Sequence, residues 1–141
     1  MKYKDVYNDY KIRKNGYCPT IEELRFLDSL SGELYEIGID FGDRVLYLLD
    51  REANIKGGCE FNPLFPAYGH KLSQLYSKDL AIDSLDINHI KFHNKYETMF
   101  SYKFLDRSSE ILKSIIEQSC DRYIAYEECL GGFYDSANRT W

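Results

Sequence analysis

The chain has 141 residues, of which 44% are hydrophobic and 29% charged, so it can bury a core without disulfides or metals. No apolar run approaches the roughly 18 residues that a membrane span needs, and the N-terminus lacks the apolar stretch of a signal peptide. We therefore expect a cytoplasmic protein that does not bind membranes. The net charge of −5 also argues against direct nucleic-acid binding, because phosphate contacts require a basic surface.

Two helices are predicted before residue 32, and they form a helical N-terminal lead. Apolar and tyrosine side chains recur at helical spacing from Tyr3 to Tyr10, which indicates a helix over residues 3–14. Thr20 and Glu23 then form a capping box, in which each side chain satisfies a free backbone amide near the other. This box predicts a second helix that begins at Ile21.

Residues 34–49 alternate and then become more apolar, which predicts a β-hairpin. A half-exposed strand over 34–41 is followed by a turn signal at Gly42-Asp43 and an apolar partner strand over 44–49. The next stretch, residues 51–69, contains paired glycines and two prolines and is interpreted as a long loop. A short helix is expected over 70–80.

The most regular pattern lies between Leu85 and Cys129. Residues 86–104 predict a hairpin of two strands, which the short polar link His93-Asn94-Lys95 connects. Apolar residues on one stripe predict a helix over 108–119. Tyr123, Ile124 and Tyr126 then favour a strand over 122–129.

These elements predict an α+β fold with an antiparallel sheet of about five strands and two or three packed helices. From residue 44 onwards their order is β-α-β-β-α-β, the ferredoxin-like order, with one added strand at 34–41. We expect a single domain that consists of the lead (1–32), a sheet-and-helix core (33–130) and a tail (131–141). Such a topology carries no functional inference by itself.

The motif search yields one weak catalytic candidate, Cys59. It follows two glycines and could act as a nucleophile with a histidine base, although no helix begins after it to lower its pKa. His89 and His93 would lie about 13 Å apart on a strand, too far to share one metal ion. Neither a phosphate loop nor a G-x-G-x-x-G fingerprint is present, so we expect no cofactor and no metal.

Composition then suggests a non-catalytic binding protein. Thirteen tyrosines, scarce valine and the acidic balance are typical of small inhibitor or immunity-type proteins from phages or low-GC bacteria, which modulate another protein with a basic surface. The expected partner-binding residues are Phe65, Tyr68, Tyr134 and Trp141. One alternative is a small-ligand, nucleotide-like binding protein with a pocket between the sheet and the 51–69 loop. The other is a cysteine-dependent enzyme centred on Cys59.

Overall fold

The structure is a computed structural model that describes residues 19–39, 42–61, 79–85, 91–92, 94–103, 110–127 and 132–137. Its helices in these ranges are α2 (Ile21–Asp28), α3 (Asp43–Asp50) and α5 (Glu110–Gln118). Its strands there are β1 (Leu34–Ile37), β2 (Ile55–Glu60), β3 (Ala81–Ser84), β4 (Tyr96–Tyr102), β5 (Cys120–Glu127) and β6 (Gly132–Asp135).

The strands form one mixed sheet in the order β3-β2-β1-β4-β5-β6. Every neighbouring pair from β3 to β5 is parallel, and only β6 runs antiparallel, beside β5. The predicted antiparallel, ferredoxin-like sheet is therefore wrong. Parallel strands are buried on both faces, so their sequences lack the clean alternation that identifies half-exposed strands.

The predicted hairpin at 34–49 is a strand followed by a helix. β1 ends at Ile37, and α3 begins at Asp43 after Gly42, which has a left-handed φ of 89° at the N-cap. The apolar residues Val45, Leu48 and Leu49 are all buried against the sheet. Their spacing of three and four is helical, so the apolar run that resembled a central strand is one face of α3.

Other predicted elements have mixed outcomes. The helix from Ile21 is confirmed as α2, because Thr20 Oγ1 accepts a 3.1 Å hydrogen bond from the backbone amide of Glu23. The helix over 108–119 and the strand over 122–129 are confirmed as α5 and β5. The helices predicted over 3–14 and 70–80 lie outside the described residues.

The remaining predictions need correction. The predicted loop over 51–69 contains strand β2, while its residues from 62 onwards lie outside the described residues. The predicted hairpin over 86–104 is wrong, because β4 pairs in parallel with β1 and β5. The predicted tail begins with β6, which extends the sheet.

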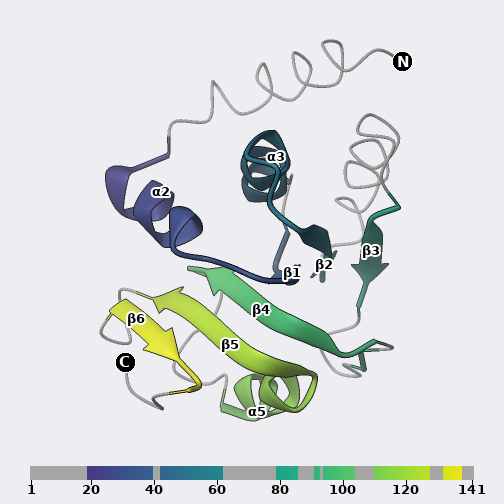
Figure 1. The fold of residues 1–141 in the computed structure, drawn as a ribbon. Coiled ribbons are helices and arrows are strands. Elements are labelled where there is room, and N and C mark those ends of the chain that lie inside the picture. Colours follow the sequence, from purple (N-terminus) through teal and green to yellow (C-terminus); the bar gives the residue numbers. More distant parts are fainter. Residues whose placement is uncertain are drawn as a thin grey trace.

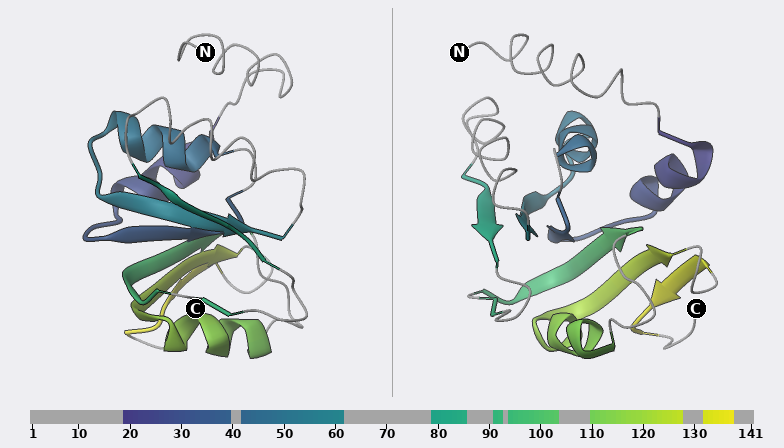
Figure 2. Two further views of the ribbon diagram at one scale, coloured as in Figure 1. Left: turned by 90° about the vertical axis from the view of Figure 1, so that its right-hand side faces the viewer. Right: turned by 180° about the vertical axis from the view of Figure 1, so that it is seen from behind.

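Helices cover both faces of the sheet (Figure 1). The two views of Figure 2 show α2 and α3 on one face and α5 on the other. The core on the α2–α3 face includes Phe26, Leu34, Val45, Phe100 and Ile124. The core on the α5 face includes Tyr35, Met99, Ile116, Tyr123 and Tyr134. Among the described residues, no helix is both long and apolar enough to cross a membrane.

The strand order reverses between β1 and β4. The chain moves outward from β1 to β2 and β3, and then returns to the other side of β1 to form β4, β5 and β6. In open parallel sheets, ligands bind outside the carboxyl ends of the strands at such a reversal. The fold therefore directs attention to the carboxyl ends of β1, β2 and β4.

Candidate functional site

A glycine-containing turn connects β1 to α3 at this point of the sheet. Gly38 and Gly42 have positive φ angles of 76° and 89°, a conformation that side chains other than glycine rarely adopt. The amides of Gly38 and Ile39 donate hydrogen bonds of 2.9 and 2.8 Å to the carbonyl of Cys59 on β2. These two hydrogen bonds thus attach the start of the turn to β2. Asp40 and Phe41, between Ile39 and Gly42, lie outside the described residues.

A carboxylate stands at the carboxyl end of β2, next to this turn. Glu60 is the last residue of the strand and is 8% exposed. Its Oε1 accepts a 3.0 Å hydrogen bond from the amide of Phe61. In doubly wound folds, an acidic residue about 20 positions after the glycine turn accepts hydrogen bonds from ribose hydroxyls. Glu60 meets this spacing relative to Gly38, and a carboxylate can accept more than one hydrogen bond.

The charges at this edge disfavour a phosphate. Helix N-termini commonly bind phosphate through their free amides, but α3 begins with the carboxylate of Asp43, which is 8% exposed. Asp43 therefore places an acidic side chain in the first turn of α3, near the amides that bind phosphate in other helices.

Arg44, the second residue of α3, contacts the turn and two acidic side chains next to it. Its Nε donates to Glu36 on β1, its Nη1 lies 3.4 Å from Glu23 Oε1 on α2, and its Nη2 lies 3.4 Å from the Gly38 carbonyl oxygen. Glu36 is fully buried, and Glu23 is 5% exposed. The guanidinium of Arg44 therefore contacts one carboxylate on β1, one carboxylate on α2 and the backbone of the turn at the same time.

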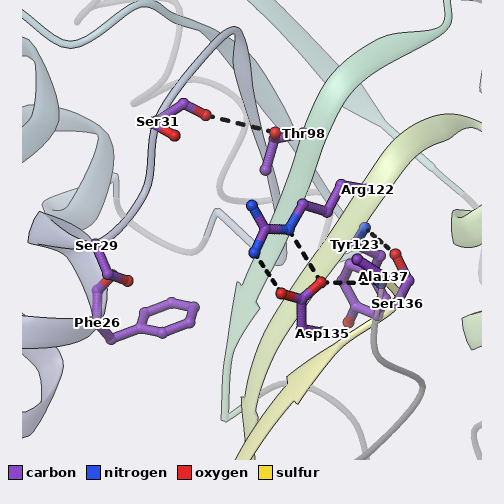
Figure 3. Close-up of polar contacts among 9 residues, drawn as sticks. All are labelled: Phe26, Ser29, Ser31, Thr98, Arg122, Tyr123, Asp135, Ser136 and Ala137. Atoms are coloured by element: carbon purple, nitrogen blue, oxygen red, sulfur yellow. Dashed lines mark hydrogen bonds and ion pairs between the residues drawn. The ribbon is translucent and has the colours of Figure 1, made fainter.

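A groove lies on the same side of the sheet, at the carboxyl ends of the next strands. It has a volume of about 460 Å³ and is lined by Glu22, Arg25, Phe26, Ser29, Tyr126 and Phe133. Figure 3 shows the Phe26 ring projecting from α2 toward the strands that carry Arg122 and Asp135. Tyr126 stacks on Tyr102, the last residue of β4, with ring centroids 5.1 Å apart. The groove thus lies between α2 and the strands β5 and β6.

Two of the site residues predicted from sequence, Cys59 and Tyr134, lie within the described part of the chain. Cys59 is fully buried, and burial raises the pKa of its thiol to about 12, so the thiolate that a nucleophile needs is scarce at neutral pH. Tyr134 is 2% exposed, and its hydroxyl hydrogen-bonds to Glu117 on α5, so it forms no exposed surface. Phe65, Tyr68 and Trp141 lie outside the described residues.

Sequence reasoning missed the Gly38–Gly42 turn and Glu60. The signal was present, because a strand pattern, two glycines four residues apart and a helical apolar spacing follow one another from Leu34 to Leu49. The interpretation of 44–49 as a strand concealed the strand–turn–helix unit. Without it, Glu60 was one acidic residue in a supposed loop.

The comparisons with known proteins come from structure alone. No protein-family model matches this sequence, and no curated protein matches it. The structure of coclaurine N-methyltransferase bound to N-methylheliamine and SAH is similar, with a TM-score of 0.62 and 13% identity over 77% of this chain and 37% of that one. The glycopeptide N-methyltransferase MtfA complexed with S-adenosyl-L-homocysteine gives a TM-score of 0.60 and 14% identity, over 84% of this chain and 63% of that one.

A third similar structure is the plantazolicin methyltransferase BpumL in complex with a pentazolic desmethylPZN analog and SAH. Its TM-score is 0.57 with 13% identity, over 88% of this chain and 51% of that one. This chain spans between about one third and two thirds of the length of these three structures. At such identities the likeness concerns the fold.

These findings contradict the function predicted from composition. The chain has a fold similar to that of these methyltransferase structures, with TM-scores between 0.56 and 0.62. The predicted non-catalytic inhibitor or immunity-type protein, and with it the modulation of host defence, is therefore wrong. The sheet is that of a Rossmann-like methyltransferase fold.

Proposed function

We propose that this chain binds S-adenosylmethionine and forms the cofactor-binding part of a methyltransferase. The observation that carries the proposal is the position of Glu60, at the carboxyl end of β2 and beside the Gly38–Gly42 turn, in a fold similar to S-adenosylmethionine-dependent enzymes. S-adenosylmethionine, when bound, supplies an electrophilic methyl group on a sulfonium cation.

Each element of the site has a role in this proposal. Glu60 accepts hydrogen bonds from the ribose hydroxyls, as an acidic residue does at this position in nucleotide-binding sheets. The turn at Gly38 and Gly42 lets the backbone approach the ligand closely, because neither residue carries a side chain. We propose that the acidic side chains of Asp43 and Glu60, which are both buried at this edge, favour the sulfonium and ammonium groups over a phosphate.

The methyl acceptor is the second ligand that a methyltransferase requires. The groove beside α2 is the part of the described structure that best suits it, because its walls include the rings of Phe26, Tyr126 and Phe133. Phe133 is 44% exposed and can still bury area against a ligand. We propose that the groove holds an apolar or aromatic part of the acceptor.

Calorimetric titration with S-adenosylhomocysteine tests the cofactor proposal directly, since this product does not react. We expect saturable binding that ATP does not compete away. Glu60→Gln should weaken the affinity about tenfold, because it replaces a charged acceptor with a neutral one. Glu110→Gln, a change of the same kind on the far face of the sheet, should leave the affinity unchanged. No binding by the wild-type protein, or equal losses in both variants, would contradict the proposal.

A further inference from the structure

We propose that Arg44 is a positioning residue, which holds the backbone at Gly38 in the place that the ligand requires. This inference rests on the proposed function, because it assigns a role within the same site. The printed partners of Arg44 are the side chains of Glu36 and Glu23 and the carbonyl of Gly38, so its proposed action on a ligand passes through the backbone at Gly38.

The geometry makes the guanidinium hard to replace. Its three nitrogens reach three separate elements: Nε meets Glu36 on β1, Nη1 meets Glu23 on α2, and Nη2 meets the carbonyl of Gly38. A planar fork with several fixed donors can satisfy these directions together, whereas an ammonium group is a single point charge. A lysine at this position would keep the positive charge but could not make all three of these contacts.

Burial makes these contacts specific. The side chain of Arg44 is 13% exposed, that of Glu23 is 7% exposed and that of Glu36 is fully buried. Hydrogen bonds between charged groups out of water are strong and directional, and they leave costly unpaired charges when one partner is removed. Tyr102 lies on the other side, with its ring centroid 5.8 Å from the guanidinium carbon. Arg44 is therefore held in one place between the turn and the end of β4.

Arg51 provides a control at the opposite, C-terminal end of α3, where its side chain is 59% exposed. It follows α3, forms a 3.3 Å ion pair with Asp28 of α2, and lies over the ring of Tyr47 at 4.7 Å. It thus makes the same kinds of contact as Arg44, one carboxylate of α2 and one tyrosine ring. No contact of Arg51 with the turn is recorded among the described residues.

The experiment compares Arg44→Lys with Arg51→Lys by two readouts. In protein labelled with ¹⁵N-glycine, the amide resonances of Gly38 and Gly42 report the shape of the turn without any ligand. Titration with S-adenosylhomocysteine, well below both melting temperatures, reports the affinity of the folded protein. Glu36→Gln is a second variant, which keeps an acceptor for Arg44 but removes its buried charge, so that the test does not depend on one substitution.

We expect Arg44→Lys to shift both glycine resonances and to weaken S-adenosylhomocysteine binding about tenfold. Glu36→Gln should shift the same resonances, and Arg51→Lys should change neither readout. Unshifted glycine resonances in both Arg44→Lys and Glu36→Gln, or equal changes in Arg51→Lys, would overturn the assignment. If the wild-type protein binds no S-adenosylhomocysteine, the proposed function fails, and the glycine resonances still decide whether Arg44 holds the turn.

Discussion

The hydroxyl of Tyr35 donates a 2.6 Å hydrogen bond to Oδ2 of Asp83 and so connects β1 to the edge strand β3. β2 lies between these strands, with Gly57 opposite Tyr35 and Cys59 opposite Asp83. Burial, above all, raises the pKa of Tyr35, so the hydroxyl keeps its proton and remains a donor at all ordinary pH values. The bond therefore ties together three neighbouring strands next to the candidate site.

Removal of this hydroxyl should destabilise the fold. Tyr35→Phe leaves Asp83 without its buried donor, and we expect the free energy of unfolding to fall by about 1–2 kcal/mol. Urea titration monitored by circular dichroism measures this change. Tyr47→Phe is the control, because the Tyr47 hydroxyl donates to Asp28 at 2.7 Å on the surface, where water can replace it. If both variants lost the same free energy of unfolding, the buried hydrogen bond would stabilise the fold no more than the exposed one does.

A second prediction concerns the close approach of β2 and β3 at Gly57. Its φ is +150°, and a Cβ added there would collide with the backbone carbonyl of Ala81. Gly132 also has a positive φ, of +102°, but an added Cβ would meet nothing within 4 Å. We expect Gly57→Ala to cost at least about 2 kcal/mol more stability than Gly132→Ala, because only the first adds a collision to the strain. Comparable unfolding midpoints would contradict this close approach.

Much of the secondary structure was predictable from the sequence, whereas the topology was not. The capping residues Thr20 and Glu23 act within one turn, so they identify α2 without knowledge of the fold. The partner of a strand is a long-range property. Residues 96–102 form a strand as expected, yet no local signal in the sequence states that β4 lies between β1 and β5 and is parallel to both. The short link before β4 favours a hairpin, and this interpretation implies an antiparallel sheet, which is wrong.

The candidate site was lost for the same reason. Glu60 and Gly38 are 22 positions apart in the sequence and adjoin only because β1 and β2 pair in parallel, with Ile37 opposite Cys59. Arg44 and Glu36 likewise meet only because residues 43–50 form a helix that folds back onto β1. On a strand, Arg44 would have belonged to a hairpin with no reason to contact Glu23.

A third prediction concerns the buried thiols. Burial raises the pKa of Cys59 to about 12 and that of Cys120 to about 11, so neither forms much thiolate at pH 8. We expect iodoacetamide to leave both unmodified in the native protein and to label both in guanidinium chloride, as peptide mass spectrometry would detect. Rapid labelling of native Cys59 would contradict this prediction and would support the alternative of a cysteine-dependent enzyme centred on Cys59.

The last prediction concerns the attachment of β6 to β5 and its dependence on pH. Asp135 accepts a 3.0 Å hydrogen bond from Arg122 Nε, a second bond from Nη2 and one from the amide of Ala137 (Figure 3). The bonds from Arg122, above all, hold the pKa of Asp135 below its ordinary value. A carboxylate with a lowered native pKa stabilises the fold above its unfolded pKa of about 4, and this contribution is lost as the pH falls further.

Asp135→Asn should therefore lower the free energy of unfolding at pH 7 by about 1 kcal/mol, a modest value because the Arg122 side chain is 47% exposed. The difference from wild type should shrink as the pH is lowered from about 5 to about 3, where the wild-type carboxyl also becomes neutral. Asp121→Asn is the control on the neighbouring strand β5, since Asp121 pairs with Lys95 while both side chains are about two-thirds exposed. Urea titrations across this pH range measure both variants. If the difference in the free energy of unfolding between Asp135→Asn and wild type stayed constant across this pH range, the charge of Asp135 would not be what holds β6 in the sheet. Its hydrogen bonds with Arg122 and Ala137 would then contribute equally with a charged and with a neutral carboxyl group.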